Sequence, residues 1–289
     1  MRSEREMFEL IINTAEDDER IRAVILNGSR ANPNAPKDIF QDFDVIFVVT
    51  DLAPFKNNDE WIKRFGEIMI KQLPEEMGDS PPEEDGCFVY LMQFTDGNRI
   101  DLTIYPLANL SEIGRDSLSV ILLDKDGIIE PFPPPLENDY LPMPPTAKAF
   151  DDCCNEFWWV SAYVAKGLWR EEITYARSML DQVLREELMK MLNWYIGVKT
   201  GFSQNPGKHG KYFQQYLEPK LWQMLLQTYM DADYENNWQA LLTMCRLFRQ
   251  VALFVEAFYG FEYPHDDDSM VFAHLEHVRN LPKDASSIY

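Results

Sequence analysis

The chain has 289 residues, of which 46% are hydrophobic, and carries a formal net charge of −21, so it can bury a sizeable core and is long enough for two domains. Residues 1–145 hold 13 Lys and Arg against 29 Asp and Glu; such acidity repels phosphate backbones and argues against nucleic acid as a partner. Without a long apolar run or an apolar N-terminal signal core, we expect no membrane span, a cytoplasmic location and reduced cysteines.

The chain opens with an amphipathic pattern over residues 2–18, which predicts a helix, and a short apolar strand comes after it at 21–26. Gly28, Ser29 and Arg30 come next. Glycine permits positive φ and close backbone approach, so the N–H groups of this turn and the Ser29 hydroxyl can face a triphosphate. A Gly-Ser pair alone is more often a plain turn. A role for this turn in phosphate binding therefore depends on the acids further along the chain.

Asp42 and Asp44 stand in an otherwise apolar strand, residues 42–49. Side chains alternate along a strand, so both carboxylates project from one face, roughly 6–7 Å apart. Unpaired charges on a buried strand are costly. Mg²⁺ is usually held by one or two carboxylates together with substrate phosphates, and it is the counter-ion that this pattern favours.

The next segment, with Trp61, Phe65, Ile68 and Met69, predicts a helix that ends near Leu73. An acidic loop at 75–85 is either a mobile lid or, more often for such segments, a solvated connection.

A β-hairpin is predicted from residues 87–94 and 99–105 around the turn Asp96-Gly97-Asn98. Asp101 lies on the polar face of its second strand. We expect the hairpin to set Asp101 beside Asp42 and Asp44. Residues 119–123 then form a last short strand.

Gly-Ser, a spacer of about a dozen residues, Asp-x-Asp and a later strand aspartate together resemble the signature of the nucleotidyltransferase superfamily. Within it, the chain is most similar to the aminoglycoside 6-adenylyltransferases, and residues 157–170 and 207–211 share that similarity. The resemblance implies a nucleotidyltransferase-type mixed sheet with helices in the N-terminal half.

Residues 131–145 are dense in proline, which excludes helix and central strand there. Beyond them helical periodicity takes over, and we expect helices near 147–168, 171–197, 211–230 (broken near Pro219), 235–259 and 267–280. The prediction is an α+β protein with a nucleotidyltransferase domain at 1–130, a proline-rich connector at 131–145 and a helical bundle at 146–289 that binds the acceptor.

The helix at 147–168 carries two stripes at steps of three and four. One stripe is apolar and predicts core packing. The other, which we call the acceptor stripe, consists of Asp152, Glu156, Trp159, Tyr163 and Lys166. Its carboxylates and aromatic rings could bind an amine- or guanidinium-bearing sugar. Packing aromatics and acids that complement the helix N-terminus are an equally good interpretation from the residues alone, and the resemblance favours acceptor binding.

Lys208 and Lys211 flank a glycine-rich turn at a helix start, where N–H groups and ammonium charges can meet phosphate oxygens. Solvated surface lysines are about as good an interpretation of this turn. We treat both residues as candidate nucleotide ligands.

The resemblance implies transfer of AMP from Mg·ATP to a hydroxyl of an aminoglycoside, with streptomycin the expected acceptor and antibiotic resistance the outcome. In a two-ion scheme, Asp42 and Asp44 ligate the ions, while Asp101 completes the site and helps deprotonate the acceptor. The acidity of the chain fits a cationic acceptor, although acidity also simply aids solubility. The alternatives are a non-catalytic, antitoxin-like nucleotide-binding module and a protein adenylyltransferase. Nothing in the sequence fixes the oligomeric state, and a monomer is favoured.

Overall fold

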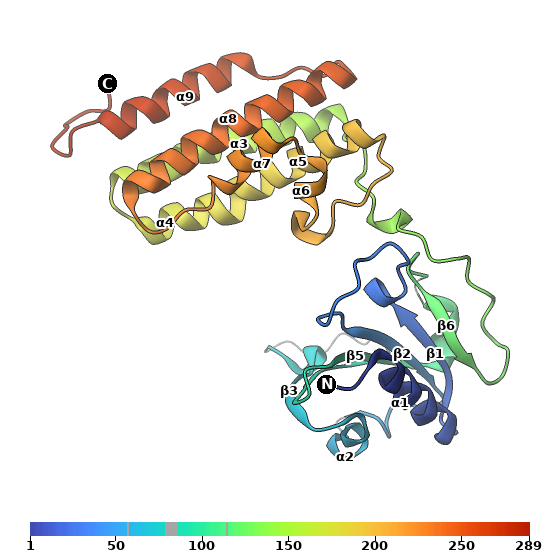
Figure 1. Cartoon of the computed structure of the whole chain (residues 1–289). Helices are drawn as coiled ribbons and strands as arrows, with labels where there is room; N and C mark the ends of the chain where they lie inside the picture. Colours follow the sequence, from blue (N-terminus) through green and yellow to red (C-terminus); the bar gives the residue numbers. More distant parts are fainter. Residues whose placement is uncertain (57, 79–85, 114) are drawn as a thin grey trace. The chain divides into compact units, whose positions relative to one another are not determined.

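The computed structural model describes residues 1–56, 58–78, 86–113 and 115–289. The chain divides into two compact units, Met1–Asp139 and Tyr140–Tyr289 (Figure 1). Most of the predicted acidic loop at 75–85 lies outside the described residues.

The first unit is built on one six-stranded mixed sheet in the order β3-β4-β5-β2-β1-β6. β2 and β5 are parallel, and the other neighbouring strands are antiparallel. The strands are β1 (Ile21–Asn27), β2 (Phe43–Val49), β3 (Ile68–Gln72), β4 (Phe88–Phe94), β5 (Arg99–Pro106) and β6 (Val120–Asp124). The predicted hairpin is confirmed as β4 and β5, as are the first and last strands.

One face of the sheet is covered by α1 (Glu4–Asp17), which begins at a capping box between Ser3 and Glu6. Its buried Met7 and Ile11 join the same apolar cluster as the inward residues of β2. The short helix α2 (Asp59–Ile62) adds a second covering segment.

The opposite face is thinner. A 3₁₀ segment, Leu107–Glu112, packs Leu107 and Leu110 against Ala23, Ile25 and Val48. Since side chains alternate, β2 presents Phe43, Val45 and Phe47 to the α1 face and Asp44 to this thinner face.

The prediction of a helix that ends near Leu73 is wrong for its second half, where the chain forms a strand. α2 and a 3₁₀ turn, Lys63–Phe65, end at Gly66, whose φ of +128° cannot continue a helix. The chain then pairs with β4 as the edge strand β3. Helical spacing of apolar residues concealed this change because tertiary pairing, not local pattern, provides the hydrogen bonds of an edge strand.

The second unit is helical. Its elements are α3 (Ala147–Trp169), α4 (Ile173–Ser178), a π-helical segment (Met179–Leu184), α5 (Arg185–Thr200), a 3₁₀ turn (Lys208–Gly210), α6 (Phe213–Tyr216), α7 (Pro219–Leu226), α8 (Tyr234–Tyr259) and α9 (His265–Asn280). The predicted single helix at 171–197 is therefore a run of three helical segments.

The core of this unit forms around α3 and α8. Phe157 of α3 stacks on Phe248 of α8 with ring centroids 3.7 Å apart, and Trp158 donates a hydrogen bond to the Tyr263 hydroxyl at 3.2 Å. The apolar stripe predicted on α3 is buried throughout. These features confirm the α+β class, and in the described part of the chain no helix has the length and apolarity that crossing a membrane requires.

Candidate active site

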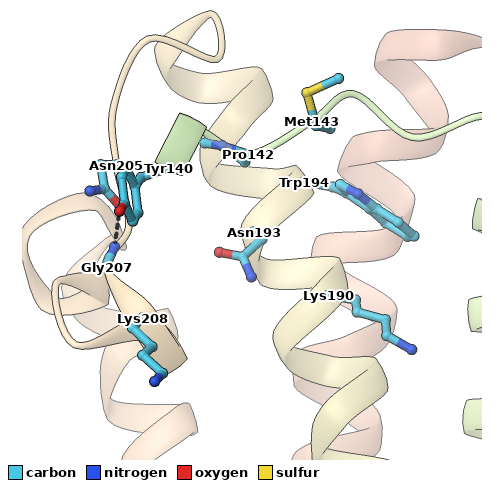
Figure 2. Close-up of a pocket in the computed structure, with 9 residues that line it drawn as sticks. All are labelled: Tyr140, Pro142, Met143, Lys190, Asn193, Trp194, Asn205, Gly207 and Lys208. Atoms are coloured by element: carbon cyan, nitrogen blue, oxygen red, sulfur yellow. Dashed lines mark hydrogen bonds between the residues drawn. The ribbon is translucent and has the colours of Figure 1, made fainter. Parts of the chain in front are cut away.

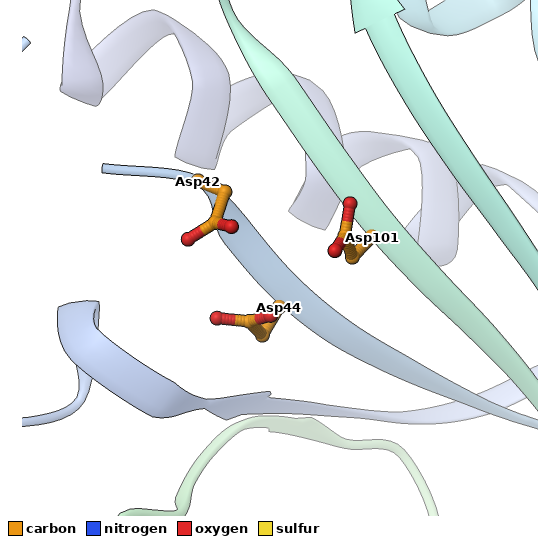
Figure 3. Close-up of side chains that lie close together, drawn as sticks. All are labelled: Asp42, Asp44 and Asp101. Atoms are coloured by element: carbon orange, nitrogen blue, oxygen red, sulfur yellow. The ribbon is translucent and has the colours of Figure 1, made fainter. Parts of the chain in front are cut away.

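Three carboxylates meet on the thinner face of the sheet. β2 and β5 run parallel in a register that places Asp44 opposite Asp101, and Asp42 comes directly before β2. Asp42, Asp44 and Asp101 each offer an oxygen, and these atoms lie within 4.8 Å of one another (Figure 3). We call this group the carboxylate cluster. Residues far apart in the sequence thus converge on one point, as the sequence predicted.

Gly28 approaches this cluster from the turn after β1. It has a φ of +72°, and a Cβ atom at this position would lie 2.3 Å from Oδ2 of Asp44. Its N–H donates to the carbonyl of Leu118 at 3.1 Å. Only glycine therefore fits between the turn and Asp44 without displacing the carboxylate.

Asp44 lies in a partly desolvated environment. Burial raises the pKa of Asp44 to about 7, and the nearby charges of Asp42 and Asp101 add to that rise. Charged carboxylates crowded together in a partly desolvated site disfavour one another. The site therefore gains free energy from any cation that enters it.

Arg99 places one positive charge beside the carboxylate cluster. Its Nε donates to Oδ1 of Asp101 and its Nη2 to Oδ2, both at 2.7 Å. Its Nε also lies 3.9 Å from Oδ2 of Asp42. The sequence pattern alone had given Arg99 no role, although its position two residues before Asp101 on a strand placed both side chains on one face.

Arg30 is held by the protein itself. Its guanidinium donates to the carbonyls of Asp42 and Gln41 at 2.8 and 2.7 Å, and lies 3.7 Å from the ring centroid of Phe43. With these contacts the side chain fixes the approach to Asp42. The nucleotide contact predicted for residues 28–30 stays a prediction that concerns their backbone and the Ser29 hydroxyl, because the Arg30 guanidinium is already bonded within the protein.

The carboxylate cluster fits a hard divalent cation. All its donors are carboxylate oxygens, which Mg²⁺ and Mn²⁺ prefer. The cluster is half-buried, so it offers a partly desolvated site that remains open to substrate.

The acceptor stripe lies on the exposed side of α3. Asp152 pairs with Lys148, and the Trp159 ring, 62% exposed, donates through Nε1 to the Tyr163 hydroxyl at 2.8 Å. Lys166 lies 4.7 Å from the Tyr163 ring centroid. Acidic and aromatic groups occupy the N-terminal part of the stripe, and a cation occupies its C-terminal end.

The two candidate lysines differ in their surroundings. Lys208 lines a cavity of about 370 Å³ with Lys190, Asn193 and Trp194 of α5 (Figure 2). Lys211 is exposed, with its Nζ 5.0 Å from the Tyr212 ring centroid. Lys208 therefore belongs to a recessed site, whereas Lys211 projects from the surface.

Comparison with known proteins extends the resemblance over most of the chain. A family described as streptomycin adenylyltransferase matches residues 1–278. The chain is 44% identical over 271 residues to an aminoglycoside 6-adenylyltransferase of Campylobacter jejuni, covering 93% of this chain and 94% of the relative. It is 42% identical over 272 residues to one of Bacillus subtilis (strain 168), covering 93% and 96%. A crystal structure of an aminoglycoside 6-adenyltransferase from Bacillus subtilis is 37% identical and covers 97% of this chain and 100% of that chain, with a TM-score of 0.48.

Proposed function

We propose that this chain, which belongs to the streptomycin adenylyltransferase family, transfers AMP from Mg·ATP to a hydroxyl of streptomycin and releases pyrophosphate, giving antibiotic resistance. The observation that carries the proposal is the carboxylate cluster, in which Asp44 and Asp101 of two parallel strands and Asp42, directly before the first of them, each bring an oxygen within 4.8 Å of the others. Membership of a family of enzymes sets aside the non-catalytic nucleotide-binding module.

In this proposal Asp42 and Asp44 hold the divalent ions, and Asp101 completes the site on the acceptor side. Bound there, two such ions would neutralise charge on the transferring phosphoryl group and make the acceptor hydroxyl more acidic. The Ser29 hydroxyl and the backbone N–H groups that follow Gly28 in this turn orient the β- and γ-phosphates, because the Gly28 N–H itself already donates to the Leu118 carbonyl. The chain thereby positions the α-phosphorus and the acceptor oxygen for in-line attack.

Residues 146–289 form the acceptor-binding domain in this proposal, and residues 1–130 the nucleotidyltransferase domain. Asp152 and Glu156 are exposed acids one turn apart on α3, and the exposed Trp159 ring comes next. Such a surface suits a guanidinium-bearing sugar, which can pair with carboxylates and stack on an indole. Streptomycin carries such groups, and the net charge of −21 would attract it from solution.

Lys208 and Lys211 are proposed to contact the nucleotide. Lys208 lines a cavity together with Lys190 and Asn193. Lys208 and Lys211 also place two cations at one turn, which is unusual in so acidic a chain. Charge-assisted hydrogen bonds from ammonium groups to phosphate oxygens are among the stronger contacts available.

Mass spectrometry of streptomycin incubated with the protein, ATP and Mg²⁺ tests the function. We expect one adenylyl group on the antibiotic and stoichiometric pyrophosphate, both lost in Asp42→Asn. Labelled ATP with and without streptomycin, followed by gel analysis, tests protein adenylylation in parallel. Label on protein with unmodified streptomycin would refute the proposal in favour of that alternative.

The acceptor stripe has its own test. Asp152→Asn combined with Glu156→Gln should lower streptomycin affinity by about 1–3 kcal/mol, since each partly desolvated charge-assisted hydrogen bond is worth that order, and should leave ATP affinity unchanged. The matched control is Glu276→Gln with Asp284→Asn, which removes the same charge from exposed positions of the same unit. Isothermal titration of both variants decides: equal losses would mean that overall acidity, and not this stripe, recruits the drug.

A further inference from the structure

Arg99 occupies the carboxylate cluster in a way that competes with a metal ion. Both of its hydrogen bonds to Asp101, at 2.7 Å, form a bidentate pair that uses both carboxylate oxygens. The same guanidinium reaches within 3.9 Å of Asp42. Arginine remains charged at any working pH, so this positive charge is fixed as long as the side chain stays in place.

A divalent cation that binds Asp42 and Asp101 would meet this fixed charge at close range. Like charges a few ångströms apart repel strongly at a partly buried site. The cation and the bidentate guanidinium therefore oppose each other at Asp101. One of them must yield for the other to bind at full strength.

The Arg99 side chain is able to leave. It is 45% exposed, whereas the Asp101 side chain is 19% exposed, and it stands on a flexible stem at the first position of β5. Once displaced from a carboxylate, a guanidinium finds its best alternative acceptors in phosphate oxygens, which match its bidentate geometry. The nucleotide of the proposed reaction brings such oxygens to the cluster together with its cation.

We propose that Arg99 is the built-in counter-ion of the carboxylate cluster and moves from Asp101 to a phosphate of the bound nucleotide, so that cation and nucleotide bind cooperatively. This inference rests on the proposed function for the identity of the nucleotide. Arg99 lowers the affinity of the free protein for the cation, and this loss disappears when a nucleotide phosphate accepts the guanidinium. Each ligand therefore raises the affinity for the other. Arg99 is a positioning residue for the free cluster and a phosphate ligand in the complex.

The first experiment measures Mn²⁺ binding by electron paramagnetic resonance, with and without α,β-methylene-ATP. Without nucleotide, Arg99→Gln should bind Mn²⁺ about tenfold more tightly than wild type, which corresponds to about 1.4 kcal/mol. With nucleotide, the same variant should bind the Mn²⁺·nucleotide complex several-fold more weakly. Asp101→Asn should abolish the tight Mn²⁺ site, which ties the signal to the cluster.

Arg22→Gln is the matched control. Arg22 lies in the same unit, and it pairs with Asp126 through two hydrogen bonds, including one from Nε at 2.7 Å. The substitution removes an equal charge from a bidentate pair with an aspartate that lies outside the carboxylate cluster. Both Mn²⁺ affinities should stay within about twofold of wild type, well below the tenfold shift that 1.4 kcal/mol represents.

The opposite signs of the two shifts make the proposal refutable. If Arg99→Gln binds Mn²⁺ no more tightly than wild type, Arg99 merely orients Asp101; if Arg22→Gln reproduces the shift, overall charge explains it. A second measurement needs only the wild type: the Arg99 Nε–H resonance, assigned by its loss in Arg99→Lys, should move when Mg²⁺ and α,β-methylene-ATP are added together. An unmoved resonance would also refute the transfer. Because neither readout uses streptomycin, failure of drug adenylylation would leave both results interpretable.

Discussion

Gly28→Ala is the sharpest test of the site because a single methyl group would strike Asp44. Gly28 has a φ of +72°, and the added Cβ would lie 2.3 Å from Oδ2 of Asp44, against 3.4 Å or more for an ordinary contact. Asp44 or the turn must therefore move by about 1 Å. A misplacement of that size in a catalytic constellation can cost on the order of 100-fold in rate.

Backbone strain must be separated from this clash. An alanine held at positive φ costs roughly 1–2 kcal/mol wherever it stands. Gly127 has a φ of +64° in the turn after β6, and a Cβ there would meet nothing within 4 Å. Gly127→Ala therefore carries the same strain without the contact to Asp44.

The assay measures adenylyl transfer and the free energy of unfolding for both variants. We expect both to lose about 1–2 kcal/mol of stability, with an approximately 100-fold loss of kcat/KM in Gly28→Ala alone. A Gly28→Ala enzyme that keeps a third or more of wild-type kcat/KM would show that the position of Asp44 beside this turn is not needed for transfer.

Three further outcomes are expected, two for the carboxylate cluster and one for Lys211. Asp42→Asn should abolish transfer without lowering the melting temperature in metal-free buffer, because repulsion within the carboxylate cluster is relieved; a variant retaining a tenth of wild-type turnover would remove Asp42 from the metal site. Burial, with Asp42 and Asp101 nearby, raises the pKa of Asp44 to about 7 from 3.8. Between these two values the folded protein keeps a proton that the unfolded chain releases. The free energy of unfolding should therefore fall as pH rises from about 4 through 7, by at most about 4 kcal/mol before solvent screening. Denaturant titrations in chelator should show this slope in wild type and its loss in Asp44→Asn, and parallel curves would contradict the raised pKa. Lys211→Ala should raise the KM for ATP more than that for streptomycin, since a charge-assisted phosphate contact is worth about 1.5–3 kcal/mol; an unchanged KM for ATP with a normal melting curve would return Lys211 to the solvated surface.

The sequence was sufficient to predict those features that depend on a local pattern of residues. Alternation along residues 42–49 and 99–105 put the acids on one face of each strand, because a pleated strand has a fixed period of two. The turn Asp96-Gly97-Asn98 forced a hairpin between β4 and β5. In the second unit, the apolar stripe of α3 was readable because helical period and burial agree.

Other features were decided only by the tertiary structure. The segment Ile68–Gln72 became an edge strand because β4 offered unpaired backbone groups, which no local pattern records. The parallel register of β2 and β5 fixed Asp44 opposite Asp101, and strand partners lie too far apart in the chain for periodicity to set their register. In the folded chain, Arg99 donates two hydrogen bonds to Asp101, and Arg30 donates to the backbone carbonyls of Asp42 and Gln41. The sequence by itself determined which acids could share a face. The packing of distant strands determined how close these acids come to one another and that the Arg99 guanidinium lies beside them. Charge interactions depend on such distances, which only the folded chain sets.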